Sequence, residues 1–150
     1  YNRAKIYEPV FDFEFSGQLF EKRLIQIQKT QDRCKKSSDY FVRAKKLHRL
    51  GKLEEAIANY RQAIKHNPNL AWYYYNLGEA LGETNAWEEA IANYHQAIAF
   101  KPDSGWLHYS LAKALIKQTQ INEAVTYYQK AIQLQPNQNF IRDKLEKIVT

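Results

Sequence analysis

The stretch GKLEEAIANYRQAIKHNP, from Gly51 to Pro68, returns 34 residues later as NAWEEAIANYHQAIAFKP, from Asn85 to Pro102. A looser copy, TQINEAVTYYQKAIQLQP, follows after another 34 residues, from Thr119 to Pro136. A fixed period of this length is typical of a solenoid, in which each repeat buries its apolar face against its neighbours. The sequence therefore predicts a chain built from three stacked repeats.

Each copy carries the signals of a helix–turn–helix unit. Gly51 suits a helix C-terminus, because glycine takes the left-handed backbone conformation at low cost. Glu54 and Glu55 suit the first turn of the next helix, where the helix dipole favours anions. Asn67 and Pro68 then end that helix. We expect paired helices over about 39–50 with 53–66, 71–84 with 87–100 and 105–118 with 121–134, followed by a last amphipathic helix over 138–149.

The first 36 residues do not follow the repeat. In Val10–Phe15 aromatic residues alternate with carboxylates, a period of two that suits an extended segment. This segment could occupy the binding groove of its own chain or of a second copy. From Gly17 to Lys36 the helical spacing of apolar residues predicts a helix that covers the open face of the first repeat. The first repeat would then begin at Ser37–Asp39, which are good N-cap residues.

Composition and charge limit the function classes. The net charge is +6, but residues 71–104 carry five acidic groups and one basic group, so no continuous basic stripe is expected. We therefore expect no nucleic-acid binding. No apolar run approaches the roughly 18 residues that span a bilayer, so we expect no membrane insertion. The single cysteine, Cys34, and the absence of a signal-peptide pattern favour a cytoplasmic location. The lack of any Met suggests a fragment of a longer protein.

Signals of catalysis are missing from the sequence. The four histidines are scattered, and none stands at metal-ligand spacing with Cys34 or with another histidine. There is no glycine-rich phosphate loop and no serine nucleophile motif. We therefore expect no metal, no cofactor and no enzyme activity in this chain. Two alternatives stay open: the recognition part of a longer enzyme, such as a transferase, or a structural piece that self-associates through residues 1–36.

The three units resemble tetratricopeptide repeats, whose pattern is W-x2-L-G-x2-Y, then A-x3-F, A and P over about 34 residues. The second unit matches this pattern at Tyr74, Leu77, Gly78, Leu81, Ala90, Tyr94, Ala97 and Pro102. The resemblance implies an all-α fold, an α-solenoid of three helix–turn–helix units. Its implied parts are an extended segment (1–16), an N-terminal helix (17–36), three repeats (37–70, 71–104 and 105–138) and a C-terminal capping helix (139–150).

The resemblance also implies which residues build the scaffold and which bind. Small residues at Ala44, Gly78, Ala112, Ala56, Ala90 and Ala124 would let paired helices approach, and Tyr60, Tyr94 and Tyr128 would fill the gap to the next pair. Proteins of this family bind partners along the concave face of the first helices. The partner would thus be a protein or peptide, apolar and partly acidic. The implied groove residues are Phe41, Lys45, Arg49, Trp72, Tyr75, Asn76, Glu79, Trp106, Tyr109 and Lys113.

One known binding mode of the family is not expected here. Members that hold the C-terminal carboxylate of chaperones use Lys, Asn, Asn, Lys and Arg at set positions. The matching positions in this chain are Phe41, Lys45, Asn76, Trp106 and Ser110. Only Asn76 agrees with the clamp, so binding of a chaperone tail through these positions is not expected.

Overall fold

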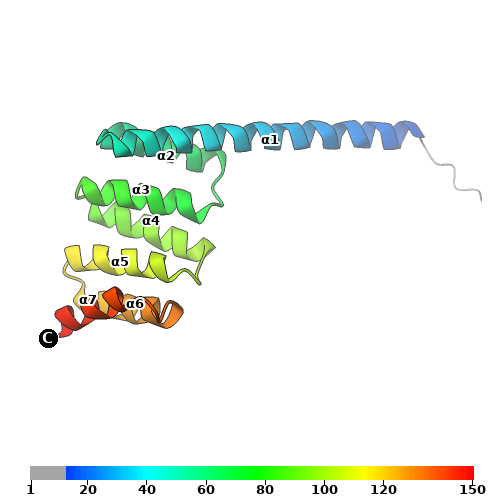
Figure 1. Cartoon of the computed structure of the whole chain (residues 1–150). Helices are drawn as coiled ribbons and strands as arrows, with labels where there is room; N and C mark the ends of the chain where they lie inside the picture. The colour runs from blue at the N-terminus through cyan, green and yellow to red at the C-terminus, as the bar shows by residue number, and fades with distance from the viewer. Residues whose placement is uncertain (1–12) are drawn as a thin grey trace, which may run out of the picture. The chain divides into compact units, whose positions relative to one another are not determined.

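The computed structural model describes the backbone of residues 13–150 and the side chains of residues 16–150 (Figure 1). Over this part of the chain the secondary structure is entirely helical, which confirms the predicted all-α fold. The helices are α1 (Phe13–Arg49), α2 (Leu53–His66), α3 (Ala71–Glu83), α4 (Trp87–Phe100), α5 (Gly105–Lys117), α6 (Ile121–Leu134) and α7 (Asn139–Val149). The chain divides into two compact units, Tyr1–Arg33 and Cys34–Thr150, and the repeats lie in the second.

Within the second unit the helices stack in the order of the chain (Figure 1). Each helix from α2 to α7 packs against the next one along the sequence. The predicted bounds of these six helices agree with the observed ones to within one residue at each end. This accuracy follows from the repeat, because three copies of each boundary signal fall at the same spacing.

Small residues bring the two helices of each pair together. Ala44 and Ala112 on the first helices are fully buried, as are Ala56, Ala90 and Ala124 on the second helices. A Cβ atom on Gly78 would lie 2.9 Å from Cε1 of Tyr94, so a larger residue does not fit there without a shift. The scaffold role predicted for these residues is confirmed.

Three equivalent tyrosines fill the space above these crossings. The exposed fractions are 0% for Tyr60, 3% for Tyr94 and 2% for Tyr128. A large aromatic side chain buries about 150–250 Å² in such a position, so these rings supply much of the apolar contact between neighbouring pairs. Their burial confirms the predicted packing role.

The turns inside the three repeats use one backbone conformation with three different residues. Gly51 has φ +73°, as predicted for a helix C-terminus, and the equivalent Asn85 and Thr119 have φ 63° and 58°. Glycine and asparagine tolerate this left-handed region, whereas a β-branched residue pays a steric cost there. The third turn therefore stores strain that the first does not.

The predicted helix start at Ser37–Asp39 is wrong, because α1 continues without a break through these residues. Ser37 is fully buried, and its hydroxyl donates to the carbonyl of Ala63 at 2.9 Å. The hydroxyl of Tyr73 lies 3.1 Å from the same Ser37 oxygen. A residue that suits an N-cap is used here to join α1, α2 and α3, so a tertiary contact overrides the local signal.

The first unit agrees with the prediction in part. Val10–Asp12 of the predicted extended segment lie outside the described residues, while the backbone of Phe13–Phe15 is helical and not extended. The helix predicted over residues 17–36 is present as part of α1, and every described side chain from 16 to 33 is exposed. That this helix covers the first repeat stays a prediction.

The last helix, α7, closes the second unit as expected for a cap. Its Ile141 is fully buried, and Leu145 and Ile148 pack against the same cluster, which contains Tyr109 of α5 and Tyr128 of α6. No helix among the described residues is long and apolar enough to cross a bilayer.

Candidate functional site

A connected row of aromatic side chains crosses α3, α5 and α7. This aromatic ridge consists of Trp72, Tyr75, Trp106, Tyr109 and Phe140. The ring centroids of Trp72 and Tyr75, of Trp106 and Tyr109, and of Tyr109 and Phe140 are each 5.3 Å apart. The indole Nε1 of Trp106 donates a 2.9 Å hydrogen bond to the Tyr75 hydroxyl, which links α5 to α3. These contacts hold the rings in fixed positions, so the ridge is a preformed surface.

The ridge exposes apolar rings to solvent. Trp72 is 46% exposed, Trp106 37% and Phe140 40%, whereas Tyr109 is only 7% exposed and belongs to the core. The ammonium group of Lys101 lies 5.8 Å from the ring centroid of Trp72. Neighbouring exposed aromatic side chains are typical of a protein-interaction surface, because the rings offer large contact area at low entropic cost.

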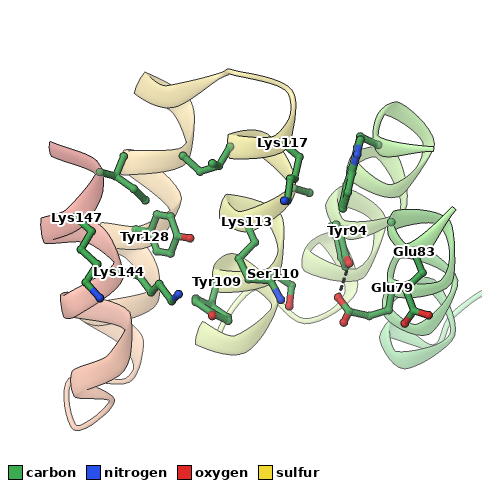
Figure 2. A pocket seen from close by; sticks show the side chains of 15 residues that line it. Glu79, Glu83, Tyr94, Tyr109, Ser110, Lys113, Lys117, Tyr128, Lys144 and Lys147 are labelled. Carbon is green, nitrogen blue, oxygen red and sulfur yellow. Dashed lines mark hydrogen bonds between the residues drawn. The ribbon is translucent and has the colours of Figure 1, made fainter. Parts of the chain in front are cut away.

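Beside the ridge lies a cavity of about 630 Å³, which we call the inter-repeat pocket (Figure 2). Its lining comes from α3, α5 and α7, and from Trp87, Tyr94 and Tyr128 on the second helices. A Cβ atom on Gly82 would lie 2.9 Å from Cζ3 of Trp87, so the glycine allows the indole to pack directly against α3. Tyr109 belongs to both the ridge and the pocket, which makes the two features neighbours.

The α3 side of the pocket is acidic, and both its carboxylates have partners in the chain. The Tyr94 hydroxyl donates a short hydrogen bond to Glu79, drawn in Figure 2. The Nε2 atom of His48 lies 2.9 Å from a carboxylate oxygen of Glu83. Burial raises the pKa of Tyr94, and the charge of Glu79 raises it further. Tyr94 therefore keeps its proton and remains a hydrogen-bond donor to Glu79.

The opposite side of the pocket is basic. Lys113 and Lys117 on α5 and Lys144 and Lys147 on α7 line it (Figure 2), and we call these four residues the lysine cluster. The ion pairs found over residues 16–150 involve other residues, so no ammonium group of the cluster has a carboxylate partner there. Lys113 places its ammonium group 5.2 Å from the ring centroid of Tyr109. The pocket therefore presents uncompensated positive charge on one side only.

The ten predicted groove residues fall into three groups. Glu79, Tyr109 and Lys113 line the inter-repeat pocket. Trp72, Tyr75, Trp106 and, again, Tyr109 form the ridge. Phe41, Lys45, Arg49 and Asn76 belong to neither.

The residues of the third group have other surroundings. Phe41 stacks on Tyr73 with a centroid distance of 4.5 Å and packs against the core, so its main contacts are structural. The amide Nδ2 of Asn76 donates to the carbonyl of Trp72 at 2.7 Å, which occupies the group expected to meet a ligand. Lys45 and Arg49 are exposed on α1, and the Lys45 ammonium group lies 5.8 Å from the ring of Phe41.

Several pocket residues were not among those predicted. Lys144 and Lys147 lie on α7, outside the repeats from which the inward positions were inferred. Ser110 also lines the pocket, and its side chain is 1% exposed. The signal that could have revealed the two lysines is their helical spacing beside Ile141 and Ile148, which places them at the edge of the apolar face of α7. Over residues 16–150 no group of His, Cys, Asp and Glu side chains is arranged to hold a metal ion.

Comparison with known proteins agrees with the repeat architecture. The family model described as TPR repeat matches residues 44–85 and 83–119, and one described as tetratricopeptide repeat matches residues 106–138. None of the curated proteins that were compared matches the chain.

Solved structures of similar fold cover most of the chain. The first TPR of Spaghetti (RPAP3) bound to the HSP90 peptide SRMEEVD has a TM-score of 0.74 at 21% identity, over 77% of this chain and 92% of that chain. The second TPR domain of human RPAP3 in complex with the HSP70 peptide SGPTIEEVD has a TM-score of 0.71 at 22% identity, over 81% and 98%. The Yersinia enterocolitica type III secretion chaperone SycD in complex with a peptide of the translocator YopD has a TM-score of 0.70 at 17% identity, over 74% and 90%.

At these identities the structural likeness shows a shared fold. The match to the repeat family is the stronger finding, because it runs without a gap from residue 44 to residue 119, more than half of the 150 residues. It covers the helices that carry the aromatic ridge and most of the inter-repeat pocket. The chain therefore belongs to the tetratricopeptide repeat family.

Proposed function

We propose that this chain is a protein-interaction adaptor that holds a peptide segment against the aromatic ridge and the adjoining inter-repeat pocket, without catalysis. The observation that carries the proposal is the exposure of Trp72 and Trp106 in a ridge whose rings are held by neighbouring rings and by a hydrogen bond. Tryptophan and tyrosine are enriched among the residues that dominate binding energy at protein interfaces. A preformed surface also avoids the entropic cost of ordering side chains on binding.

Peptide binding by structures of the same fold supports the proposal. The RPAP3 domains and SycD described above were each solved with a bound peptide. The ligand of this chain is proposed to differ from a chaperone tail. Of the clamp positions, Phe41 packs against the core, Ser110 is buried, and the Asn76 amide already donates to Trp72.

The test is a selection of dodecapeptides from a random displayed library on the immobilised chain, followed by measurement of Kd in solution. We expect the double variant Trp72→Ala/Trp106→Ala to weaken binding of the selected peptides by about 30-fold, the usual size for loss of an interface hot spot. Circular dichroism of the variant would verify that the helices are intact.

The matched control is Phe100→Ala, which removes another exposed aromatic ring, 44% exposed, from outside the ridge. This variant should keep the affinity of the unchanged chain. The proposal fails if the two tryptophans can be removed without loss of affinity, or if Phe100→Ala weakens binding to the same extent.

A second candidate function, self-association through α1, rests on a separate observation in the first unit. Phe20, Leu24 and Ile27 are 63%, 49% and 52% exposed, and their spacing of four and three residues places them on one side of the helix. Lys22 and Lys29 lie on the opposite side by the same periodicity. Two copies can therefore bring their apolar sides together while their ammonium groups stay apart, which favours a second copy as the occupant.

Sedimentation equilibrium would test this candidate. The double variant Leu24→Glu/Ile27→Glu should shift a concentration-dependent dimer to monomer, because it buries carboxylates in the interface. The matched control is Ile25→Glu, since Ile25 is equally exposed, at 55%, but lies on the basic side. A monomeric unchanged chain, or equal effects of both variants, would rule the candidate out.

A further inference from the structure

We propose that the lysine cluster is a binding subsite for an anionic side chain, a carboxylate or a phosphate, carried by the bound peptide. The inference rests on the proposed function, because it names the chemistry that a peptide on the aromatic ridge must bring to the inter-repeat pocket. It does not follow from the clamp positions of the family. Lys113, Lys117, Lys144 and Lys147 are not the residues that match those positions.

The first step is the placement of the four ammonium groups. Lys113 and Lys117 are one turn apart on α5, and Lys144 and Lys147 are one turn apart on α7. All four line one cavity of about 630 Å³ between these helices and α3 (Figure 2). Like charges gathered around a cavity repel each other, and an anion between them relieves that repulsion. Two helices thus contribute to one basic site.

The second step is the charge balance inside the pocket. The cavity also contains Glu79 and Glu83, but these carboxylates are already bound to Tyr94 and His48 on the side away from the cluster. No described acidic residue pairs with any of the four lysines. A ligand anion would therefore meet free ammonium groups, while the acidic side would reject it. This asymmetry fixes where along the pocket the anion lies.

The third step is a buried hydroxyl without a hydrogen bond. The Oγ atom of Ser110 is inaccessible to solvent and has no partner of accepted geometry among the described residues, although Ser110 lines the pocket next to Lys113 in the helix. Ser110 lies close enough to Tyr75 to lower the pKa of that phenol, but no well-formed hydrogen bond joins the two. Buried polar groups usually have a partner. An oxygen of a bound carboxylate or phosphate would supply one.

The shape of the site favours a side chain of a peptide over a nucleic-acid backbone. The positive charge is confined to a pocket, and the α3 side of the same pocket carries carboxylates. A phosphate backbone needs a continuous basic track. A single anionic side chain flanked by apolar residues fits both the pocket and the neighbouring ridge.

The experiment uses peptides from the selection described above, resynthesised with one position set in turn to Glu, phosphoserine, Gln and Ser. We expect at least one position at which the Glu or phosphoserine peptide binds about tenfold or more tightly than its neutral counterpart, since charge-assisted hydrogen bonds are the strong ones. The Glu and phosphoserine arms distinguish a carboxylate site from a phosphate site.

The variants Lys113→Gln/Lys117→Gln and Lys144→Gln/Lys147→Gln should each remove this preference for the anion while leaving the neutral peptide almost unaffected. The matched control is Lys46→Gln/Lys65→Gln, which removes the same charge from exposed positions outside the pocket and should keep the preference. Ser110→Ala should reduce the preference by a smaller factor.

The outcomes separate this inference from the proposed function. Peptides that bind through Trp72 and Trp106 but show no preference for the anion at any position overturn the inference and leave the adaptor role standing. An equal loss in the Lys46→Gln/Lys65→Gln control also overturns it, because net charge would then explain the effect. Tighter binding of single-stranded RNA through the same four lysines would replace the peptide as ligand. If no peptide binds the unchanged chain, both proposals fall.

Discussion

The second and third repeats are built on the same scaffold and differ in charge at one equivalent position. Glu79 on α3 and Lys113 on α5 are 34 residues apart and line opposite sides of the inter-repeat pocket. The carboxylate is bound by Tyr94, whereas the ammonium group has no carboxylate partner among the described residues. Where the repeats agree they build the fold. Where they disagree, one residue serves the internal packing and the other stays available for a ligand.

The tyrosines at the equivalent positions of α4 and α6 show the same divergence. Tyr94 donates to Glu79, but the hydroxyl of Tyr128 has no hydrogen-bond partner found over residues 16–150. Burial and, to a lesser extent, Tyr109 raise the pKa of Tyr128 to about 12, while the pKa of Tyr94 lies higher still because Glu79 adds its charge. A residue repeated for its ring therefore has a hydroxyl whose chemistry is set by its repeat.

The largest expected effect comes from making the second repeat like the third at Gly82. The equivalent residue in the third repeat is Ile116, so the change is Gly82→Ile. A side chain there meets the ring of Trp87, since a Cβ atom alone would lie 2.9 Å from Cζ3. We expect a loss of about 1–3 kcal/mol in the free energy of unfolding, measured by urea denaturation. The change Gly82→Ile with Trp87→Ile, which copies the third repeat fully, should recover part of the loss, and its failure to do so would contradict the steric explanation.

A smaller effect is expected when the tyrosine hydroxyls are removed one at a time. Tyr94→Phe should cost about 1–2 kcal/mol of unfolding free energy, because it breaks a hydrogen bond to a partly buried carboxylate. Tyr128→Phe should change the same quantity by less than about 0.5 kcal/mol, because no protein partner is lost. Chemical denaturation of the two variants side by side measures the difference. Equal costs would mean that the hydrogen bond to Glu79 contributes nothing beyond the ring itself.

The turns provide a comparison of the next size. Thr119→Gly should raise the free energy of unfolding by about 0.5–1 kcal/mol, because it relieves a β-branched residue at φ 58°. Gly51→Ala should lower it by about 1 kcal/mol, since the position has φ +73° and no neighbouring atom within 4 Å to blame for a clash. Thermal unfolding of both variants would measure the effect. Asn85→Gly is the control and should lie between them, as asparagine tolerates this conformation.

The smallest effect at neutral pH concerns the phenols, which matter only in alkali. Burial raises the pKa of both Tyr60 and Tyr128 from 10.0 to about 12 in the folded chain. Between these values the unfolded chain loses protons that the folded chain keeps, so the unfolded state is favoured as pH rises. Their contribution to stability is thus complete below pH 10 and is lost as pH rises through 12. Denaturation curves across this window should show falling stability.

The phenolate absorbance of the folded chain offers an independent measurement. Tyr60 and Tyr128 should ionise late, and Tyr94 should ionise last. Glu79→Gln should lower the pKa of Tyr94 by removing the neighbouring charge, while leaving Tyr60 unaffected. Ionisation of all buried tyrosines at the ordinary pKa, or an unchanged Tyr94 in the variant, would show that the rings are more accessible than the structure has them.

The sequence was informative wherever three copies constrained the same feature. The bounds of α2 to α7, the buried alanines and the left-handed Gly51 all follow from a pattern that packing repeats. The start of the first repeat was mispredicted, because Ser37 gives the same local signal whether it caps a helix or hydrogen-bonds to Ala63 inside one. Only the tertiary contact distinguishes the two cases.

The site was predicted less completely than the fold. Inward positions inferred from the repeat found Glu79, Tyr109 and Lys113, but such positions could not reveal which exposed side chains already had partners. Phe41 occupies an inward position and yet packs on Tyr73, because the neighbouring ring happens to be within reach. Lys144 and Lys147 escaped because α7 belongs to no repeat.

The contact of Gly82 with Trp87 has a consequence for how the chain finds its register as it folds. The sequences of α2 and α4 are so alike that a first helix could recruit the wrong second helix, one repeat out of step. The residues at these two positions are His48 with Leu53, Gly82 with Trp87, and Ile116 with Ile121, so only the middle pair joins the smallest residue to the largest. A mispaired α3 would leave a void beside Leu53, and a mispaired α4 would press its indole against a histidine or an isoleucine. One size match thus penalises the misaligned arrangements that near-identical repeats would otherwise permit.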